Sequence, residues 1–184
     1  YWEYTPRLEV AKWWGKNHVA LSYQLNDRPY DNRTETDGTG ANIPGTQLEF
    51  NVHRAELEWL QYWGPNGDWR TSTRIRRELS FDNGAGFFKY RRWRIGEKIR
   101  FRRGKWTING EFNWSAYYYP NQIATFGLTD RRKRSDWDVG LRINRQLNKF
   151  WTAYLAYDYE KADSNQASSS YEVKIVHAGL VFER

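Results

Sequence analysis

Cysteine and methionine are both absent from this chain of 184 residues. Without cysteine the chain has no disulfide, no thiolate nucleophile and no cysteine-ligated metal. Because the first residue is Tyr1 and not methionine, we expect the chain to be processed or trimmed, with a secretory signal removed before Tyr1. Long apolar runs are absent as well. No run approaches the roughly 18 residues of a membrane-spanning helix, which excludes a helical membrane protein.

The aromatic residues argue against disorder, although the chain is very polar. Its mean hydropathy is −0.95 and 28% of its residues are charged. Even so, 11 Trp, 13 Tyr and 9 Phe make up 18% of the chain, whereas disordered segments are poor in aromatics. The length predicts one domain over residues 1–184. The net charge of +7 is compatible with nucleic acid, with anionic lipid headgroups or with no particular partner.

Apolar and polar residues alternate with a period of two along most of the chain, which predicts β-strands and not helices. In residues 106–118, for example, Trp106, Ile108, Phe112 and Trp114 alternate with polar side chains. We count about nine such strands. The alternation slips by one place near Arg54, where a β-bulge would produce the shift.

The connections between these strands alternate in length. "WGKN", "GPNG", "RRGK" and "QLNK" are short, whereas the connections at 26–46, 120–134 and 161–170 are long, with "DNGAG" the exception. Short periplasmic turns and longer external loops are typical of outer-membrane barrels. We therefore predict an all-β fold, an antiparallel up-and-down transmembrane β-barrel of about 8–10 strands.

Aromatic residues gather at the predicted strand ends, as in interfacial girdles, where one end of the ring is apolar and the other wet. The alternative is that they fill a soluble core. These residues are Trp13, Trp14, Trp59, Tyr62, Trp63, Trp69, Trp106, Tyr117 to Tyr119, Phe150, Trp151, Tyr157 and Tyr159.

The polar face of the strands is charged, with both signs present. In a barrel of about eight strands, side chains just fill the interior, and Arg would pair there with carboxylates better than Lys does. We expect a lumen charge network of Arg70, Arg74, Arg76, Glu78, Arg94, Glu111 and Arg142. The alternative is an ordinary solvated surface.

The C-terminal stretch "VKIVHAGLVFER" resembles the last strand of bacterial outer-membrane proteins in the spacing of His177, Gly179 and Phe182. It departs from that pattern at Glu183 and Arg184, where the final aromatic is usual. By its pattern nearly the whole chain resembles a small outer-membrane β-barrel of Gram-negative bacteria, of the OmpA transmembrane-domain and OmpX type. That resemblance implies residence in the outer membrane, insertion by the barrel-assembly machinery and contact with lipopolysaccharide.

Three charged residues and the strand count do not fit this pattern simply. Arg77 and Arg91 lie in register with apolar neighbours and flank "DNGAG", so we expect them above the membrane. Glu97 requires a bulge near Gly96. Single-chain bacterial barrels usually have even strand numbers. Either residues 1–6 therefore belong to a strand that our count places wrongly, or one strand is absent here or supplied by another chain.

The sequence contains little that points to catalysis or metal binding. The three histidines, His18, His53 and His177, have no convergent spacing, so we predict no enzyme, no metal site and no cofactor. Asp and Asn oxygens in residues 26–42 could bind calcium, but a solvated loop is the favoured interpretation.

The basic run Arg131, Arg132, Lys133 and Arg134 lies in a predicted external loop, where it could pair with lipopolysaccharide phosphates. The alternative is a solvated turn. No identifiable fold or aromatic platform supports nucleic-acid binding.

We therefore expect an integral outer-membrane barrel with a charged, packed lumen. It would act as a membrane anchor, as a scaffold for other envelope proteins or as a narrow channel. The alternatives are a soluble antiparallel barrel that binds a small apolar ligand, and a barrel enzyme that modifies lipid A.

Overall fold

The computed structural model describes residues 2–124 and 129–183, and within them the chain forms one sheet of nine strands in sequence order. The strands are β1 (Arg7–Trp14), β2 (Asn17–Pro29), β3 (Glu49–Trp63), β4 (Trp69–Asp82), β5 (Tyr90–Arg103), β6 (Trp106–Ile123), β7 (Arg131–Gln146), β8 (Trp151–Ser164) and β9 (Tyr171–Phe182). One 3-10 turn, η1 (Ala167–Ser169), precedes β9. No helix in the described residues is long and apolar enough to cross a membrane.

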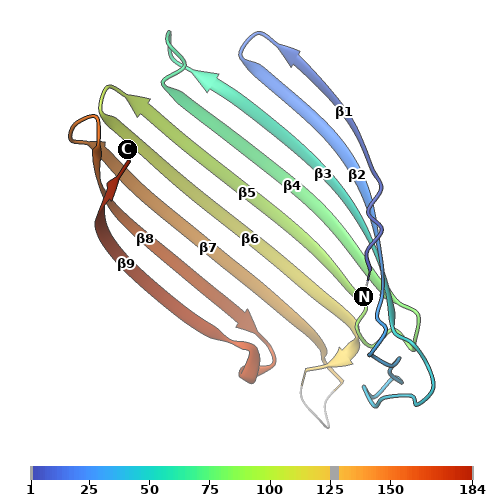
Figure 1. Ribbon diagram of the computed structural model, residues 1–184. Coiled ribbons are helices and arrows are strands. Elements are labelled where there is room, and N and C mark those ends of the chain that lie inside the picture. The colour runs from blue at the N-terminus through green and yellow to red at the C-terminus, as the bar shows by residue number, and fades with distance from the viewer. Residues whose placement is uncertain (1, 125–128, 184) are drawn as a thin grey trace.

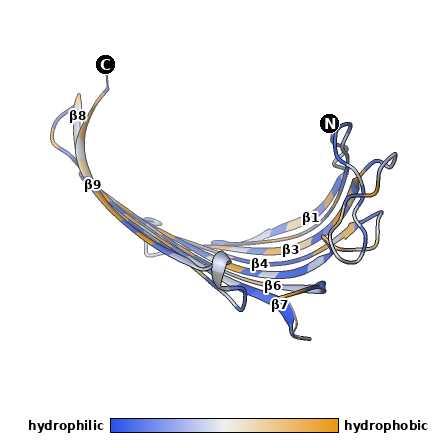
Figure 2. Ribbon diagram, turned by 90° about the horizontal axis from the view of Figure 1, so that it is seen from below, coloured by the Kyte–Doolittle hydropathy of each residue, from blue (hydrophilic) through white to orange (hydrophobic). Residues whose placement is uncertain are grey.

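Each strand pairs antiparallel with the next, so the sheet is an up-and-down meander (Figure 1). The predicted fold class, all-β and antiparallel with up-and-down order, is confirmed. The sheet curves into a trough, and β1 and β9 form its two separate edges (Figure 2). Short turns lie at one end of the trough and the longer loops lie at the other (Figure 1). We call these the short-turn end and the long-loop end.

The strands extend further toward the long-loop end than the sequence predicted. β2 continues to Pro29, β6 to Ile123 and β8 to Ser164, and β7 begins at Arg131. These polar strand ends stay in the backbone ladder, where the hydrogen bonds do not depend on apolar side chains. The predicted loop at 120–134 is therefore shorter, and its residues 125–128 lie outside the described part of the chain.

The β-bulge predicted near Arg54 is wrong. β3 pairs without a register shift with β2 from Glu49 to Gln61 and with β4 from Phe50 to Trp63. The apolar pattern slips because Phe50 and Val52 face the other side of the sheet from Leu57. Phe50 belongs to an aromatic cluster there, with ring centroids 5.8 Å from Tyr30 and 5.7 Å from Phe88.

The two faces of the sheet differ sharply in chemistry. The convex face carries cross-strand rows of apolar side chains, such as the row Leu21, Leu57, Ile75, Ile95, Trp114 and Trp137, of which all but the half-buried Trp114 are exposed. The concave face carries most of the charged side chains of the strands, and most of the buried residues are small or polar. A soluble barrel that binds an apolar ligand needs the opposite arrangement, so the sidedness argues against that alternative.

Aromatic residues line the convex face at the short-turn end, namely Trp14, Trp63, Trp69, Trp106, Trp151 and Phe182. This placement is what an interfacial girdle requires, and the girdle itself stays a prediction. Trp13, Tyr62, Tyr117 and Tyr119, which the sequence analysis included, lie instead on the concave face.

Glu97 lies on the convex face without the bulge that was predicted near Gly96, because the ladders on both sides of β5 are continuous. Its carboxylate accepts a hydrogen bond of 2.5 Å from the hydroxyl of Thr73, the residue directly opposite on β4. The pairing gives this carboxylate a polar partner on an otherwise apolar surface.

Sidedness can be tested with two neighbouring residues of β9. Val176 faces the convex side and is 69% exposed, whereas Ile175 faces the concave side and is 50% exposed. We expect Val176→Arg to lower the free energy of unfolding by about 2–4 kcal/mol, the cost of Arg in hydrocarbon near the midplane. Ile175→Arg, the matched control, should change it little. Urea titration in lipid vesicles measures both, and equal losses would contradict the assignment of the faces.

Candidate functional site

All seven residues of the predicted lumen charge network lie on the concave face. The cross-strand register places Arg70, Arg74, Arg76 and Glu78 of β4 on the same side as Arg94 of β5, Glu111 of β6 and Arg142 of β7. They do not form one network, however. Carboxylates neutralise the part toward the long loops, whereas part of the short-turn end has no such partners.

Toward the long loops, the charges form cross-strand ion pairs. Arg76 donates to Glu56 at 2.7 Å and Arg74 donates to Glu58 at 2.9 Å. Glu78 lies at the centre of this part and is only 2% exposed. Its carboxylate accepts from Arg54 at 2.9 Å and from the Tyr90 hydroxyl at 2.6 Å. Buried charge is tolerated here because the lone pairs of the carboxylate are satisfied.

Arg54, Tyr90 and Arg92 were not among the predicted site residues. They meet Glu78 from the two neighbouring strands: Arg54 and Arg92 are its direct partners in the register, and Tyr90 is one row away. Arg92 lies 3.9 Å from the Glu78 carboxylate. Only the register brings these side chains together, and the strand pattern of a single segment carries no signal for it.

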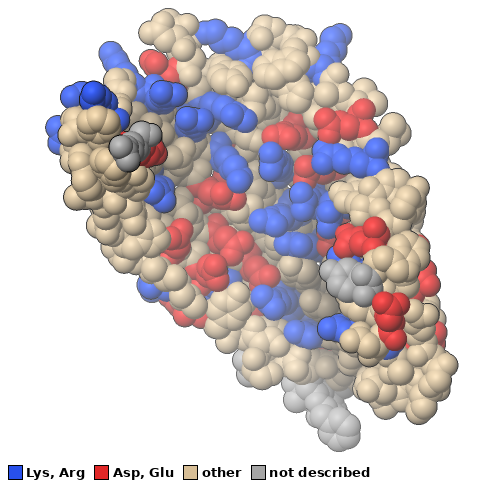
Figure 3. Space-filling view, viewed as in Figure 1, with Lys and Arg blue, Asp and Glu red and all other residues tan. Residues whose placement is uncertain are grey.

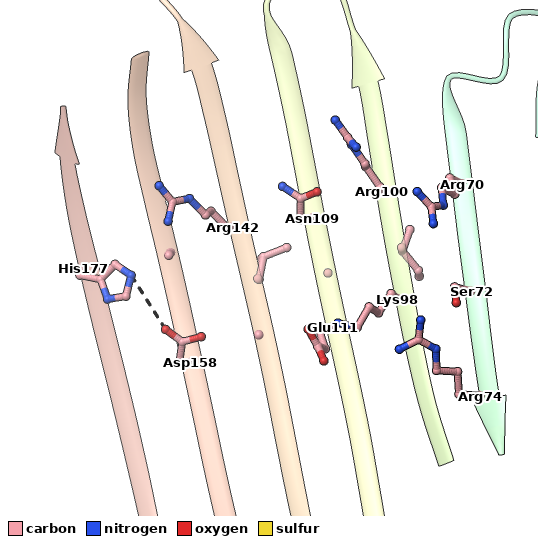
Figure 4. Close-up of a pocket in the computed structure, with 15 residues that line it drawn as sticks. Arg70, Ser72, Arg74, Lys98, Arg100, Asn109, Glu111, Arg142, Asp158 and His177 are labelled. Atoms are coloured by element: carbon pink, nitrogen blue, oxygen red, sulfur yellow. Dashed lines mark ion pairs between the residues drawn. The ribbon is translucent and has the colours of Figure 1, made fainter. Parts of the chain in front are cut away.

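Near the short-turn end, one cross-strand row holds three arginines and no carboxylate. The register runs from Arg70 on β4 through Arg100, Asn109, Arg142 and Ala156 to His177 on β9 (Figure 4). We call Arg70, Arg100 and Arg142 the arginine row. Arg70 and Arg100 are directly opposite each other, and like charges in that position are destabilising.

The arginine row has few internal partners. The guanidinium of Arg142 lies 4.3 Å from the ring centroid of Tyr154, and its Nε donates to Asn144 at 3.0 Å. That of Arg70 lies 5.9 Å from the ring centroid of Tyr62. Within the described residues, none of the three arginines forms an ion pair. The row is therefore a source of uncompensated positive charge.

A hollow of about 610 Å³ lies along this row in the concave face. Two of its lining residues, Gly140 and Ala156, have little or no side chain, so no bulk fills the space between the strands there. On the side toward the long loops, Lys98 pairs with Glu111 at 3.1 Å, and Asp158 lies 3.9 Å from His177. Lys and Arg gather over the concave face toward the short-turn end (Figure 3). The hollow thus has arginines without ion pairs on one side and carboxylates beside Lys98 and His177 on the other.

Arg94 faces Arg76 across the β4–β5 ladder and forms no ion pair among the described residues. It lines a smaller hollow next to the arginine row together with Glu56, Arg74, Lys98 and Glu111. Arg94 is therefore a cation without an ion pair in the part of the face where carboxylates are also present.

The basic run at 131–134 is not a loop, as the sequence analysis predicted, but the start of β7. The strand alternation divides it between the two faces. Arg132 and Arg134 point to the concave side, where Arg132 donates to Gln122 at 2.8 Å and Arg134 donates to Asp136 at 2.6 Å. Arg131 and Lys133 lie on the convex side. Of the four cations, only these two have the orientation that a lipid contact needs.

The three histidines lie in different environments. The ring of His18 lies 4.6 Å from that of Trp13, and the ring of His53 is hydrogen-bonded to the Tyr23 hydroxyl at 2.5 Å on the convex face. His177 lies in the hollow beside Asp158. Within the described residues they do not converge on one site.

The C-terminal pattern has a structural explanation. Gly179 faces the ring of Tyr154 so closely that an added Cβ would lie 2.9 Å from it, so glycine is what allows the ring to cover the strand. Phe182 points to the convex face, with its ring 5.1 Å from that of Trp151. Arg184 lies outside the described residues. Recognition of this strand by the barrel-assembly machinery stays a prediction.

Comparison with known proteins identifies the fold. No family model and no curated protein matches the chain. Two solved structures of OmpT, an outer membrane protein of Vibrio cholerae, are similar to it: the in-vitro folded protein and a variant with loop L8 deleted. Each has a TM-score of 0.67 at 11% sequence identity and covers 98% of this chain.

This likeness shows the fold of outer-membrane β-barrel proteins and supports the predicted outer-membrane location. The chain spans 54% and 56% of the length of the two OmpT chains, about half of each. The resemblance to the small OmpA or OmpX type stays a prediction.

The prediction that the chain is not an enzyme is corrected by the same comparison. It rested on the scattered histidines and on a small-barrel pattern, whereas the structural neighbours are OmpT proteins. At 11% identity they show the fold alone, and that fold gives no ground for excluding catalysis.

The difference between buried and exposed charge can be measured with two glutamates. Glu78→Ala leaves Arg54, Arg92 and the Tyr90 hydroxyl without their partner, and we expect it to cost about 3–5 kcal/mol of unfolding free energy. Glu111 pairs with Lys98 at side-chain exposures of 43% and 52%. Glu111→Ala, the control, should therefore cost about 0–1 kcal/mol. Denaturant titration of the two refolded variants compares them, and similar losses would contradict a buried cluster centred on Glu78.

Proposed function

We propose that this chain forms the wall of an outer-membrane channel, and that the arginine row draws anionic solutes into its lumen. The sidedness of the sheet supports the membrane part of the proposal. Rows of exposed apolar side chains on the convex face suit hydrocarbon, and the charged concave face suits a water-filled interior.

The proposed lumen is open and not packed with side chains. Nine strands leave a trough with an unfilled hollow of about 610 Å³, and the OmpT chains that share the fold are nearly twice as long. Barrel diameter grows with strand number, and wide barrels hold an aqueous channel. For these reasons we favour a channel over an anchor or a scaffold for envelope proteins.

The observation that carries the proposed selectivity is the uncompensated charge of Arg70, Arg100 and Arg142. Fixed charge of one sign in a confined space raises the local concentration of the opposite ion. Guanidinium groups also present several N–H donors to carboxylates and phosphates. An anion that passes along the hollow would replace the missing carboxylate of this row.

The proposal is tested by ion selectivity in planar bilayers. We expect the native protein to conduct ions. Under a salt gradient, the sign of its reversal potential should show that anions permeate better than cations. Replacing Arg70, Arg100 and Arg142 together with Gln should move the chloride-to-potassium permeability ratio toward unity or below, because the charge that concentrates anions is lost. Arg103→Gln, on the convex face at the same end, is the control and should leave the ratio unchanged.

Two results would overturn the proposal. Absence of any conductance would favour the anchor or scaffold role. A permeability ratio that the triple variant leaves at its native value would show that the arginine row does not set selectivity.

A further inference from the structure

The convex face carries a group of cations at the long-loop end that the proposed channel does not use. Arg91, Tyr118 and Lys133 follow one another in register across β5, β6 and β7. In the next row, Arg77 of β4 is opposite Trp93 of β5. These five residues line a groove of about 570 Å³, which we call the outer cationic groove.

Three cations of this groove have no ion-pair partner among the described residues. Arg77 stacks on Trp93 with its guanidinium carbon 4.8 Å from the ring centroid. Among the described residues, Arg77, Arg91 and Lys133 form no ion pair. Asp163, the carboxylate among the described residues that line the groove, is already paired with Lys161 at 2.9 Å. The groove therefore lacks the negative partner that a charge beside hydrocarbon needs.

We propose that the outer cationic groove binds the phosphorylated headgroup of lipopolysaccharide; this inference rests on the proposed outer-membrane location. The long-loop end is the external end of such barrels, so the groove lies at the level of the outer-leaflet headgroups. Arg91 and Lys133 flank Tyr118 and can bind phosphate oxygens through charge-assisted hydrogen bonds.

The remaining lining residues suit the other parts of such a lipid. Trp93 and Tyr118 are 48% and 36% exposed and offer ring surfaces next to the cations. Toward the short-turn end the groove leads onto the apolar row that contains Ile95, Trp114 and Trp137, where acyl chains can pack. An anionic headgroup with acyl chains attached fits this order of cation, aromatic ring and apolar surface better than a free anion does.

The opposite end of the same face provides a matched control. There Arg103, Trp106 and Arg145 also form a cation–aromatic–cation row across β5, β6 and β7. The guanidinium of Arg145 lies 5.1 Å from the Trp106 ring centroid. This row lies at the short-turn end, away from the outer leaflet, so a double variant there removes equal charge from the same face without touching the groove.

The experiment measures binding of the native protein in detergent to lipid A that carries both phosphates and to lipid A from which they were removed. We expect the phosphorylated form to bind more tightly. Replacing Arg91 and Lys133 with Gln should weaken binding by about a hundredfold, because each lost charge-assisted hydrogen bond to phosphate costs about tenfold or more in affinity. The Arg103→Gln, Arg145→Gln control should bind like the native protein.

Any of four outcomes would overturn the inference. Equal binding of dephosphorylated lipid A would show that phosphate is not recognised, and equal loss in the control variant would show unspecific charge attraction. Competition by inorganic phosphate at the lipid concentration would show a free-anion site and not a headgroup site. Channel measurements on the Arg91→Gln, Lys133→Gln variant separate this inference from the proposed channel function. Lost lipid binding with unchanged ion selectivity supports the lipid site in the groove. Retained lipid binding with lost ion selectivity refutes that site.

Discussion

Backbone hydrogen bonds between neighbouring strands keep this sheet in register from β1 to β9, and the register decides which side chains meet. Because side chains alternate between faces, ladders that run without a register shift, except near the end of β6, keep most of the charged residues on one face and the apolar rows on the other. The long stretches without a register shift matter for this reason: a slip of one residue would place arginines in hydrocarbon and tryptophans in the lumen.

The concave face uses its charges in two different ways. Toward the long loops, carboxylates such as Glu78 satisfy the arginines and cross-link the strands. In the row formed by Arg70, Arg100 and Arg142, the like charges remain unmatched, and this arrangement lowers stability. The ion pairs that stabilise the sheet and the arginines for which we propose solute attraction thus lie in different rows of the same face.

The alternation of residue types along the chain was enough to predict the strands, their antiparallel order and the charged face, because these follow from local period and connection length. The partners across strands could not be predicted. Arg54 meets Glu78 through a register that depends on the whole sheet. Phe50 suggested a bulge because an aromatic residue on the charged face looks out of phase with the apolar residues of the other face. The polar strand end Arg131–Arg134 was predicted as a loop because of its polarity, but polar side chains do not end a backbone ladder.

The direction of the two edge strands limits how this wall can be completed into a cylinder. Neighbouring strands are antiparallel and nine is an odd number, so β1 and β9 run the same way. A direct seam between them would be parallel, and so would both seams of a ring made from two such sheets related by rotation about the pore axis. An all-antiparallel cylinder therefore needs an odd number of further strands between β9 and β1, and the first of them must run opposite to β9. A second copy of this sheet has an odd number of strands, but rotation about the pore axis leaves its strands running the wrong way for both seams.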